Sequence, residues 1–222
     1  MQYFTPKFFK FFDELAKNNN KEWFEKNRET YEKEVKSPFK KLVEDLSEKL
    51  ANDLPEINRN ASKAIFRINR DIRFSKDKSP YKVNVAAVFS RTGTKDDLYP
   101  GFYIHFGADD IIVGGGKYFC SKEDVAKIRQ EIFYNHEIFK KLLNDKAFKE
   151  KFGTLQGEKN KVLEPQYKEF SSIEPLIANK QFWYYAKLTR KDITSDKLDE
   201  LVYSYFRSSY KMNRFLFEAT SN

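Results

Sequence analysis

The spacing of apolar residues changes twice along this chain, and this change constrains the fold more than any other feature. In the first quarter, apolar residues recur every three or four positions, as in amphipathic helices. Between about residues 83 and 113 they alternate with polar residues, as in strands that bury one face. Helical spacing returns afterwards and continues to residue 217. This order predicts an α+β fold, in which a central antiparallel sheet is flanked by N-terminal and C-terminal helices.

Three helices are expected before the sheet. Thr5–Pro6 has the pattern of an N-cap followed by a proline in the first turn, and Asn20 can cap the second helix. Ser37–Pro38 repeats the first pattern and predicts the start of the third helix, which ends before Pro55.

The strands and the later helices follow from the same reasoning. We expect strands at residues 64–68, 83–89, 102–106 and 111–113, with turns at 91–94 and 109–110. Connections this short favour antiparallel neighbours, and Gly114–Gly116 is expected to be a turn that ends the last strand. Ser121 and Asp124 resemble a capping box, so a helix should begin there. Further helices are expected at 136–143, 146–151 and 196–217, with loop from 153 to 180 and an ambiguous aromatic segment at 181–189.

Composition limits the classes of protein to which the chain can belong. A length of 222 residues with 22 Phe and 13 Tyr is enough for a real core, and no linker divides it, so we expect one domain over residues 1–222. The only cysteine, Cys120, excludes an internal disulfide and fits the reducing cytoplasm. No apolar run reaches the roughly 18 residues that a membrane span needs. With only His105 and His136 beside this cysteine, a His/Cys zinc site is not expected, and the nucleotide, hydrolase and metalloprotease motifs are absent. We therefore expect no metal and no cofactor.

The basic charge is concentrated in one short stretch. The net charge is +8, and residues 59–82 carry eight basic and two acidic residues, a net of +6, which leaves +2 for the rest. Strand alternation predicts that Phe66, Ile68, Ile72 and Phe74 lie on one buried face. Cations beside a buried apolar face cost free energy unless a partner offsets their desolvation.

The same stretch carries a resemblance to a known family. Residues Arg70–Lys82, which read RDIRFSKDKSPYK, resemble the signature of the domain of unknown function family 2461. Other marks of that family are Asn18–Asn19, Trp23–Phe24, the strand Pro100–His105 and Gly114–Gly116. The resemblance covers nearly the whole chain. It implies one cytosolic α+β domain and no established activity.

Four interpretations of the basic stretch remain open. The first is a small-anion site, because arginine offers a rigid fork to phosphate or carboxylate and lysine adds a point charge; the glycines could add backbone N–H groups as an anion nest. The second is single-stranded nucleic acid, with Tyr81, Tyr99, Tyr103 and Trp183 for stacking. The third is an enzyme acting on a phosphorylated substrate. The fourth is a solvated connector in which Asp71 and Asp77 pair with neighbouring cations.

We take the small-anion site as the leading hypothesis, and expect no membrane partner. The residues expected to form the site are Arg67, Arg70, Asp71, Arg73, Lys76, Lys78, Tyr81, Lys82, Tyr103 and His105.

Overall fold

The computed structural model describes residues 1–96 and 99–221. Its contacts group the chain into two compact units, each assembled from three stretches. Unit 1 comprises Met1–Lys95, Tyr103–Val113 and Lys187–Tyr203, and unit 2 comprises Asp96–Phe102, Gly114–Ala186 and Ser204–Asn222. The single domain expected from the sequence stays a prediction.

The central element is an antiparallel sheet of four strands. These are β1 (Asn84–Phe89), β2 (Gly101–Gly107), β3 (Ile111–Lys117) and β4 (Phe182–Lys187), in the order β1-β2-β3-β4. Because neighbours in the sheet are also successive strands in sequence, it is a meander. Short connections predicted the neighbours β1, β2 and β3, whereas β4 joins the sheet after a long helical segment. Together with the helices on either side in sequence, it confirms the α+β class.

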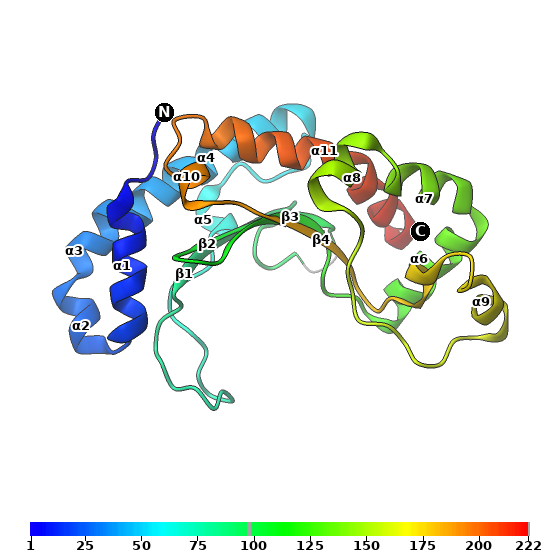
Figure 1. Ribbon diagram of the computed structural model, residues 1–222, viewed down its shortest axis with the longest axis horizontal. Coiled ribbons are helices and arrows are strands. Elements are labelled where there is room, and N and C mark those ends of the chain that lie inside the picture. Colours follow the sequence, from blue (N-terminus) through cyan, green and yellow to red (C-terminus); the bar gives the residue numbers. More distant parts are fainter. Residues whose placement is uncertain (97–98, 222) are drawn as a thin grey trace. The chain divides into compact units, whose positions relative to one another are not determined.

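Unit 1 begins with helices whose starts are fixed by short polar side chains. They are α1 (Pro6–Lys17), α2 (Lys21–Lys26), α3 (Arg28–Tyr31), the π-helical segment η1 (Glu32–Lys36), α4 (Ser37–Asp53) and the short turn α5 (Ala61–Ala64), drawn from blue to cyan in Figure 1. The Thr5 side chain accepts a hydrogen bond from Lys7 N, and the Asn20 side chain accepts one from Trp23 N. Both predicted caps are confirmed.

The prediction at Ser37–Pro38 is right about where α4 begins, at Ser37, but wrong about Ser37 being an N-cap. The residues on both sides of the predicted boundary, Lys36 and Ser37, are right-handed helical, and Lys36 makes no capping hydrogen bond. The π-helical turn η1 lies just before Pro38, where the wider turn accommodates a residue that lacks an N–H group. The helix therefore runs without interruption from α3 through α4.

The core of unit 1 is built largely from phenylalanine. Phe4, Phe8 and Phe12 are fully buried, and Phe4 and Phe39 both meet Phe106 of β2 edge-on, with ring centroids 6.1 and 6.0 Å apart. One face of β2 therefore packs on the N-terminal helices. Its alternate residues, Tyr103 and His105, lie on the other face and are only half-buried, as the predicted alternation requires.

Unit 2 contains most of the later helices. They are α6 (Lys122–Tyr134), α7 (His136–Leu143), α8 (Lys146–Phe152), α9 (Pro165–Phe170) and the 3₁₀ turn η2 (Pro175–Ala178); α10 (Arg190–Ile193) belongs to unit 1, and α11 (Leu198–Ser221) contributes to both units. The capping box at Ser121 and Asp124 is confirmed. The core includes Ile128, Phe139 and Tyr184.

Three expectations about local structure require correction. The segment at 153–180 contains α9 and η2, and the ambiguous segment at 181–189 forms β4. Residues 61–64 form α5, and the predicted strand at 64–68 is reduced to an isolated bridge between Ile65 and Ala87. The three glycines at 114–116 lie inside β3 rather than in a turn after it. Among the described residues, no helix is long and apolar enough to cross a membrane.

Candidate functional site

The basic stretch forms a projecting arm in unit 1. The arm, defined as residues 66–82, is an irregular hairpin that leaves the sheet just before β1 (Figure 1). Its two legs pair through the bridge Asn69–Tyr81 and through hydrogen bonds from Arg70 N to Pro80 O (2.9 Å) and from Lys82 N to Ile68 O (2.8 Å). We call residues 66–69 and 81–82 the arm root and residues 70–80 the arm tip.

The arm root is fixed to the N-terminal helices through Tyr81. The side-chain amide of Asn19 donates to Tyr81 O at 2.9 Å, and its carbonyl oxygen accepts from Tyr81 N at 3.1 Å. The Tyr81 ring stacks on Phe24, with centroids 4.0 Å apart, and is only 6% exposed. Tyr81 therefore supports the arm, and its ring is not available to stack on a ligand. The sequence singled out Asn19 only as part of the Asn18–Asn19 pair that contributes to the family resemblance.

In the arm tip, the two acids pair with Arg70 and Arg73, two of the arginines predicted to bind an anion. Asp71 accepts hydrogen bonds from Arg73 Nη2 (2.7 Å) and Nε (3.0 Å), and this contact lowers the pKa of Asp71 to about 2. Asp77 forms an ion pair with Arg70 and accepts from the Ser79 hydroxyl at 2.6 Å. The contacts with Ser79 and then Arg70 hold the pKa of Asp77 well below its usual range. Both arginines thus already have carboxylate partners.

Much of the remaining tip is exposed, and a hydrogen bond from a side chain to the backbone of the tip helps to hold it. Lys78 Nζ donates to Ile72 O at 2.9 Å. Phe74 is 96% exposed, so the expectation that it lies on a buried face is wrong. The alternation ended because the chain turns at the tip, where period-two spacing no longer assigns side chains to faces. Within the described part of the chain, Lys76 has neither an ion pair nor a hydrogen bond to its side chain.

At the arm root, several predicted residues come together on the half-buried face of β2. We call Phe66, Arg67, Lys82, Tyr103 and His105 the root cluster. Lys82 Nζ lies 5.4 Å from the centroid of the Phe66 ring, which in turn meets the Tyr103 ring edge-on at 6.4 Å. The Tyr103 hydroxyl is 3.2 Å from His105 Nδ1. The arm and β2 therefore bring together an apolar ring, a cation, a hydroxyl and an imidazole, and the charge of the exposed Arg67 acts on Lys82.

His105 is held in its neutral form at this position. Burial is the main cause that lowers its pKa; Lys82 adds to the effect and Asp110 opposes it. His105 Nε2 faces Asp110 at 3.5 Å, which favours the proton on Nε2. Nδ1 can then accept the hydrogen bond from the Tyr103 hydroxyl.

Arg67 and Lys82 bring like charges close together. Partial burial and, secondly, the charge of Arg67 lower the pKa of Lys82. Over residues 1–96 and 99–221, no carboxylate forms an ion pair with either side chain. The acid whose pKa responds to Arg67 is Asp71, and its oxygens are already bonded to Arg73. Arg67 and Lys82 at the root are therefore cations without a carboxylate partner in the described ranges, as are Lys76 and Lys78 at the tip, but only Lys82 of these four is partly buried.

The glycines have a packing role that the sequence did not show. A Cβ at Gly114 would lie 2.3 Å from Tyr184 O, and one at Gly116 would lie 2.3 Å from Phe182 O. The strand β3 thus approaches β4 too closely for any side chain at these positions. This requirement explains the glycines without an anion nest.

A second basic position was missed from the sequence. Arg190 lies 5.0 Å from the Phe9 ring centroid, pairs with Asp109 (2.9 Å) and Asp13 (3.4 Å), and lines an open pocket of about 460 Å³ with Lys10. Asp109 is the main cause that raises the pKa of Arg190. Because two acids already hold this guanidinium, the pocket is a weaker anion site than the root cluster.

Nucleophilic and metal chemistry finds little support in the described residues. Burial raises the pKa of the Cys120 thiol to about 11, which disfavours the reactive thiolate. In the described ranges, no group of three His, Cys, Asp or Glu side chains is arranged to hold a metal ion.

Comparison with known proteins gives a family but no activity. Residues 7–215 match DUF2461, which is described as a conserved hypothetical protein. No curated protein matches the chain.

Proposed function

The chain belongs to DUF2461, a family of conserved hypothetical proteins, and we propose that it binds a small anionic ligand at the root cluster. The ligand would carry one phosphate or carboxylate group. The proposal retains Arg67, Lys82, Tyr103 and His105 from the sequence hypothesis and gives Arg70 and Arg73 the role of shaping the arm tip.

The observation that carries this proposal is the pair Arg67 and Lys82. Lys82 is half-buried, and the nearby charge of Arg67 adds to the lowering of its pKa, which is unfavourable for the charged form unless something offsets the repulsion. Within the described residues no carboxylate does so. An anion placed between them would convert a repulsive contact into two attractive ones.

The surrounding groups suit an anion of limited size. The Arg67 guanidinium offers two parallel N–H donors to a phosphate or carboxylate, and Lys82 adds a point charge. The Phe66 ring and the partial burial of Lys82 lower the local dielectric and strengthen these contacts. On protonation, His105 would supply a third positive charge. The single cysteine is consistent with a ligand from the cytoplasm.

A melting series tests the proposal. Sulfate, phosphate and citrate should raise the midpoint relative to chloride at matched ionic strength. The stabilisation from a ligand present at a hundred times its dissociation constant is about 2.7 kcal/mol. Changing Lys82 to Gln or Arg67 to Gln should remove most of this shift.

Lys76→Gln is the matched control. It removes one positive charge from the same arm, but from the exposed tip, so it should preserve the anion-dependent shift. Equal loss of the shift in Lys76→Gln and Lys82→Gln would show a diffuse charge effect. Absence of any shift beyond chloride in the unaltered protein would refute the proposal.

One observation favours a second candidate, single-stranded nucleic acid. Phe74 is almost fully exposed at the arm tip, with Lys76 and Lys78 close in sequence, and could stack on a base while the lysines meet phosphates. Oligothymidine binding that weakens steeply with salt and is lost in Phe74→Ser would support this candidate. Loss in Lys82→Gln alone would favour the small-anion site.

A further inference from the structure

Unit 2 carries an exposed row of aromatic rings that the root cluster does not use. We call Phe119, Tyr118, Trp183 and Tyr185 the aromatic track. Successive ring centroids in this order are 5.1, 6.1 and 5.5 Å apart, and the rings of Trp183 and Tyr185 are stacked. The track therefore crosses from the segment after β3 onto β4 without a gap.

The track is directed away from the core of unit 2. Trp183 and Tyr185 alternate along β4 with Phe182 and Tyr184, which are fully buried. Tyr118 is 60%, Phe119 67% and Tyr185 37% exposed, and Trp183 is half-buried. Gly114 and Gly116 of the neighbouring strand add no side chains beside these rings. Contiguous exposed rings of this kind are costly in water and commonly mark a binding surface.

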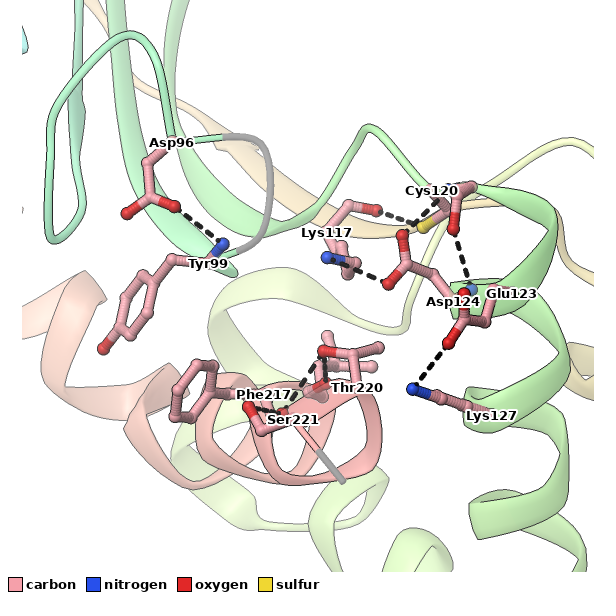
Figure 2. A network of polar contacts seen from close by, with 12 residues as sticks. Asp96, Tyr99, Lys117, Cys120, Glu123, Asp124, Lys127, Phe217, Thr220 and Ser221 are labelled. Atoms are coloured by element: carbon pink, nitrogen blue, oxygen red, sulfur yellow. Dashed lines mark hydrogen bonds and ion pairs between the residues drawn. The ribbon is translucent and has the colours of Figure 1, made fainter.

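At one end, the track reaches a pocket with an exposed acid. Phe119 lines an open pocket of about 420 Å³ together with Cys120, Ser121, Glu123, Asp124, Lys127 and Thr220. Figure 2 shows α6 supplying Glu123, Asp124 and Lys127 on one side and α11 supplying Thr220 on the other. The Asp124 carboxylate accepts a hydrogen bond from the Ser121 backbone N–H (2.8 Å) and forms an ion pair with the buried Lys117 (3.5 Å).

Glu123 is the carboxylate of this pocket that remains accessible. Its side chain is 76% exposed and pairs with Lys127 at 2.8 Å on the helix surface. Surface pairs of this kind contribute little free energy, so a cation from a partner can compete for the carboxylate.

Two lysines of the segments that carry the track are already paired with acids. A stacking platform for single strands also needs cations for the phosphates. Lys117 is buried against Asp124, and Lys180, next in sequence to the β4 region, pairs with Glu158 at 3.5 Å. The exposed carboxylate of Glu123 favours a ligand that is positive where it meets this end of the track.

We propose that the aromatic track binds a proline-rich peptide segment in the polyproline II conformation, with a lysine or arginine of that segment at Glu123. Polyproline II rises about 3.1 Å per residue, so alternate residues are about 6 Å apart, which matches the ring spacing of the track. Such segments dock on aromatic surfaces because their conformation is already ordered.

The test uses the full chain and a fluorescent peptide of about ten prolines ending in arginine, followed by anisotropy. The peptide should bind, and Phe119→Ser and Trp183→Ala should each weaken it at least about tenfold, as expected for an interface anchor. Tyr134→Ser is the matched control, since Tyr134 is 72% exposed on α6 outside the track, and it should leave binding unchanged. Phe119→Ser protects the test against misfolding, because this ring is mostly exposed.

A second comparison isolates the acid. Peptides with and without the terminal arginine should differ in affinity for the unaltered chain, and Glu123→Gln should abolish the difference while preserving binding of the neutral peptide. Equal binding to the unaltered chain and Phe119→Ser would overturn the proposal. The proposal would also be overturned if the chain bound oligothymidine or a neutral oligosaccharide but not the proline peptide, and if Phe119→Ser weakened that binding.

Discussion

Asn19 should determine whether the arm stays fixed to the N-terminal helices. Its side chain makes both hydrogen bonds with the backbone of Tyr81, at 2.9 and 3.1 Å. Changing Asn19 to Ala removes both. A net hydrogen bond contributes about 1 kcal/mol, so the free energy of unfolding should fall by about 2 kcal/mol. For a chain of this length, that corresponds to a melting temperature lower by about 4–8 °C.

Asn18→Ala provides the control for this substitution. The Asn18 amide donates to Glu14 O within its own helix and is exposed, so its loss should cost less than about 1 kcal/mol. Urea unfolding of the two variants gives the comparison. Limited trypsin digestion adds a local readout, because the arm tip contains Arg73 and Lys76 on its exposed surface. Cleavage in the tip should be faster in Asn19→Ala.

The Asn19 amide does not hold the arm if Asn19→Ala and Asn18→Ala unfold at the same urea concentration and are cleaved at equal rates. That result would show that the stacking of Tyr81 on Phe24 holds the arm without the amide.

Three further predictions follow from single contacts. The folded-state pKa of His105 is lowered, so the folded protein should lose stability as pH falls below the ordinary value of about 6.5, and His105→Gln should flatten this part of the unfolding profile. Gly114→Ala places a Cβ 2.3 Å from Tyr184 O and should cost about 3 kcal/mol or more in urea unfolding; Gly153→Ala, where φ is +73° in open space, should cost less. Tyr184→Phe removes the buried hydrogen bond to Asn213 (2.7 Å) and should cost about 1–3 kcal/mol by the same assay, whereas equal stability would show that the hydroxyl contributes nothing.

Features fixed by neighbouring residues were predictable from the sequence. The caps at Thr5, Asn20 and Ser121 each act within three residues, so their pattern identified the helix starts. The alternation along β2 also placed Tyr103 and His105 on the same half-buried face. Ser37–Pro38 marked the start of α4, but no local signal showed that the π-helical turn before Pro38 joins α4 to the preceding helix.

Features that depend on distant residues were not predictable. Asn19 meets Tyr81 across 62 positions, and the glycines of β3 are explained by the approach of β4, some seventy residues later. Charge counting correctly concentrated the basic excess at 59–82 but could not show which cations had acids. The pairing of Asp71 with Arg73 and of Asp77 with Arg70 restricts the candidate site from the whole arm to its root.

The pKa of Lys82 tests the small-anion proposal most directly. NMR titration of the Lys82 side chain would follow its pKa in the free protein and with saturating sulfate, which does not itself titrate in this range. In the free protein the pKa should lie below the ordinary value of about 10.4, because of burial and Arg67. Sulfate should raise it, and Arg67→Gln should raise it without sulfate. An ordinary pKa in the free protein, or a pKa that sulfate leaves unchanged, would contradict the account.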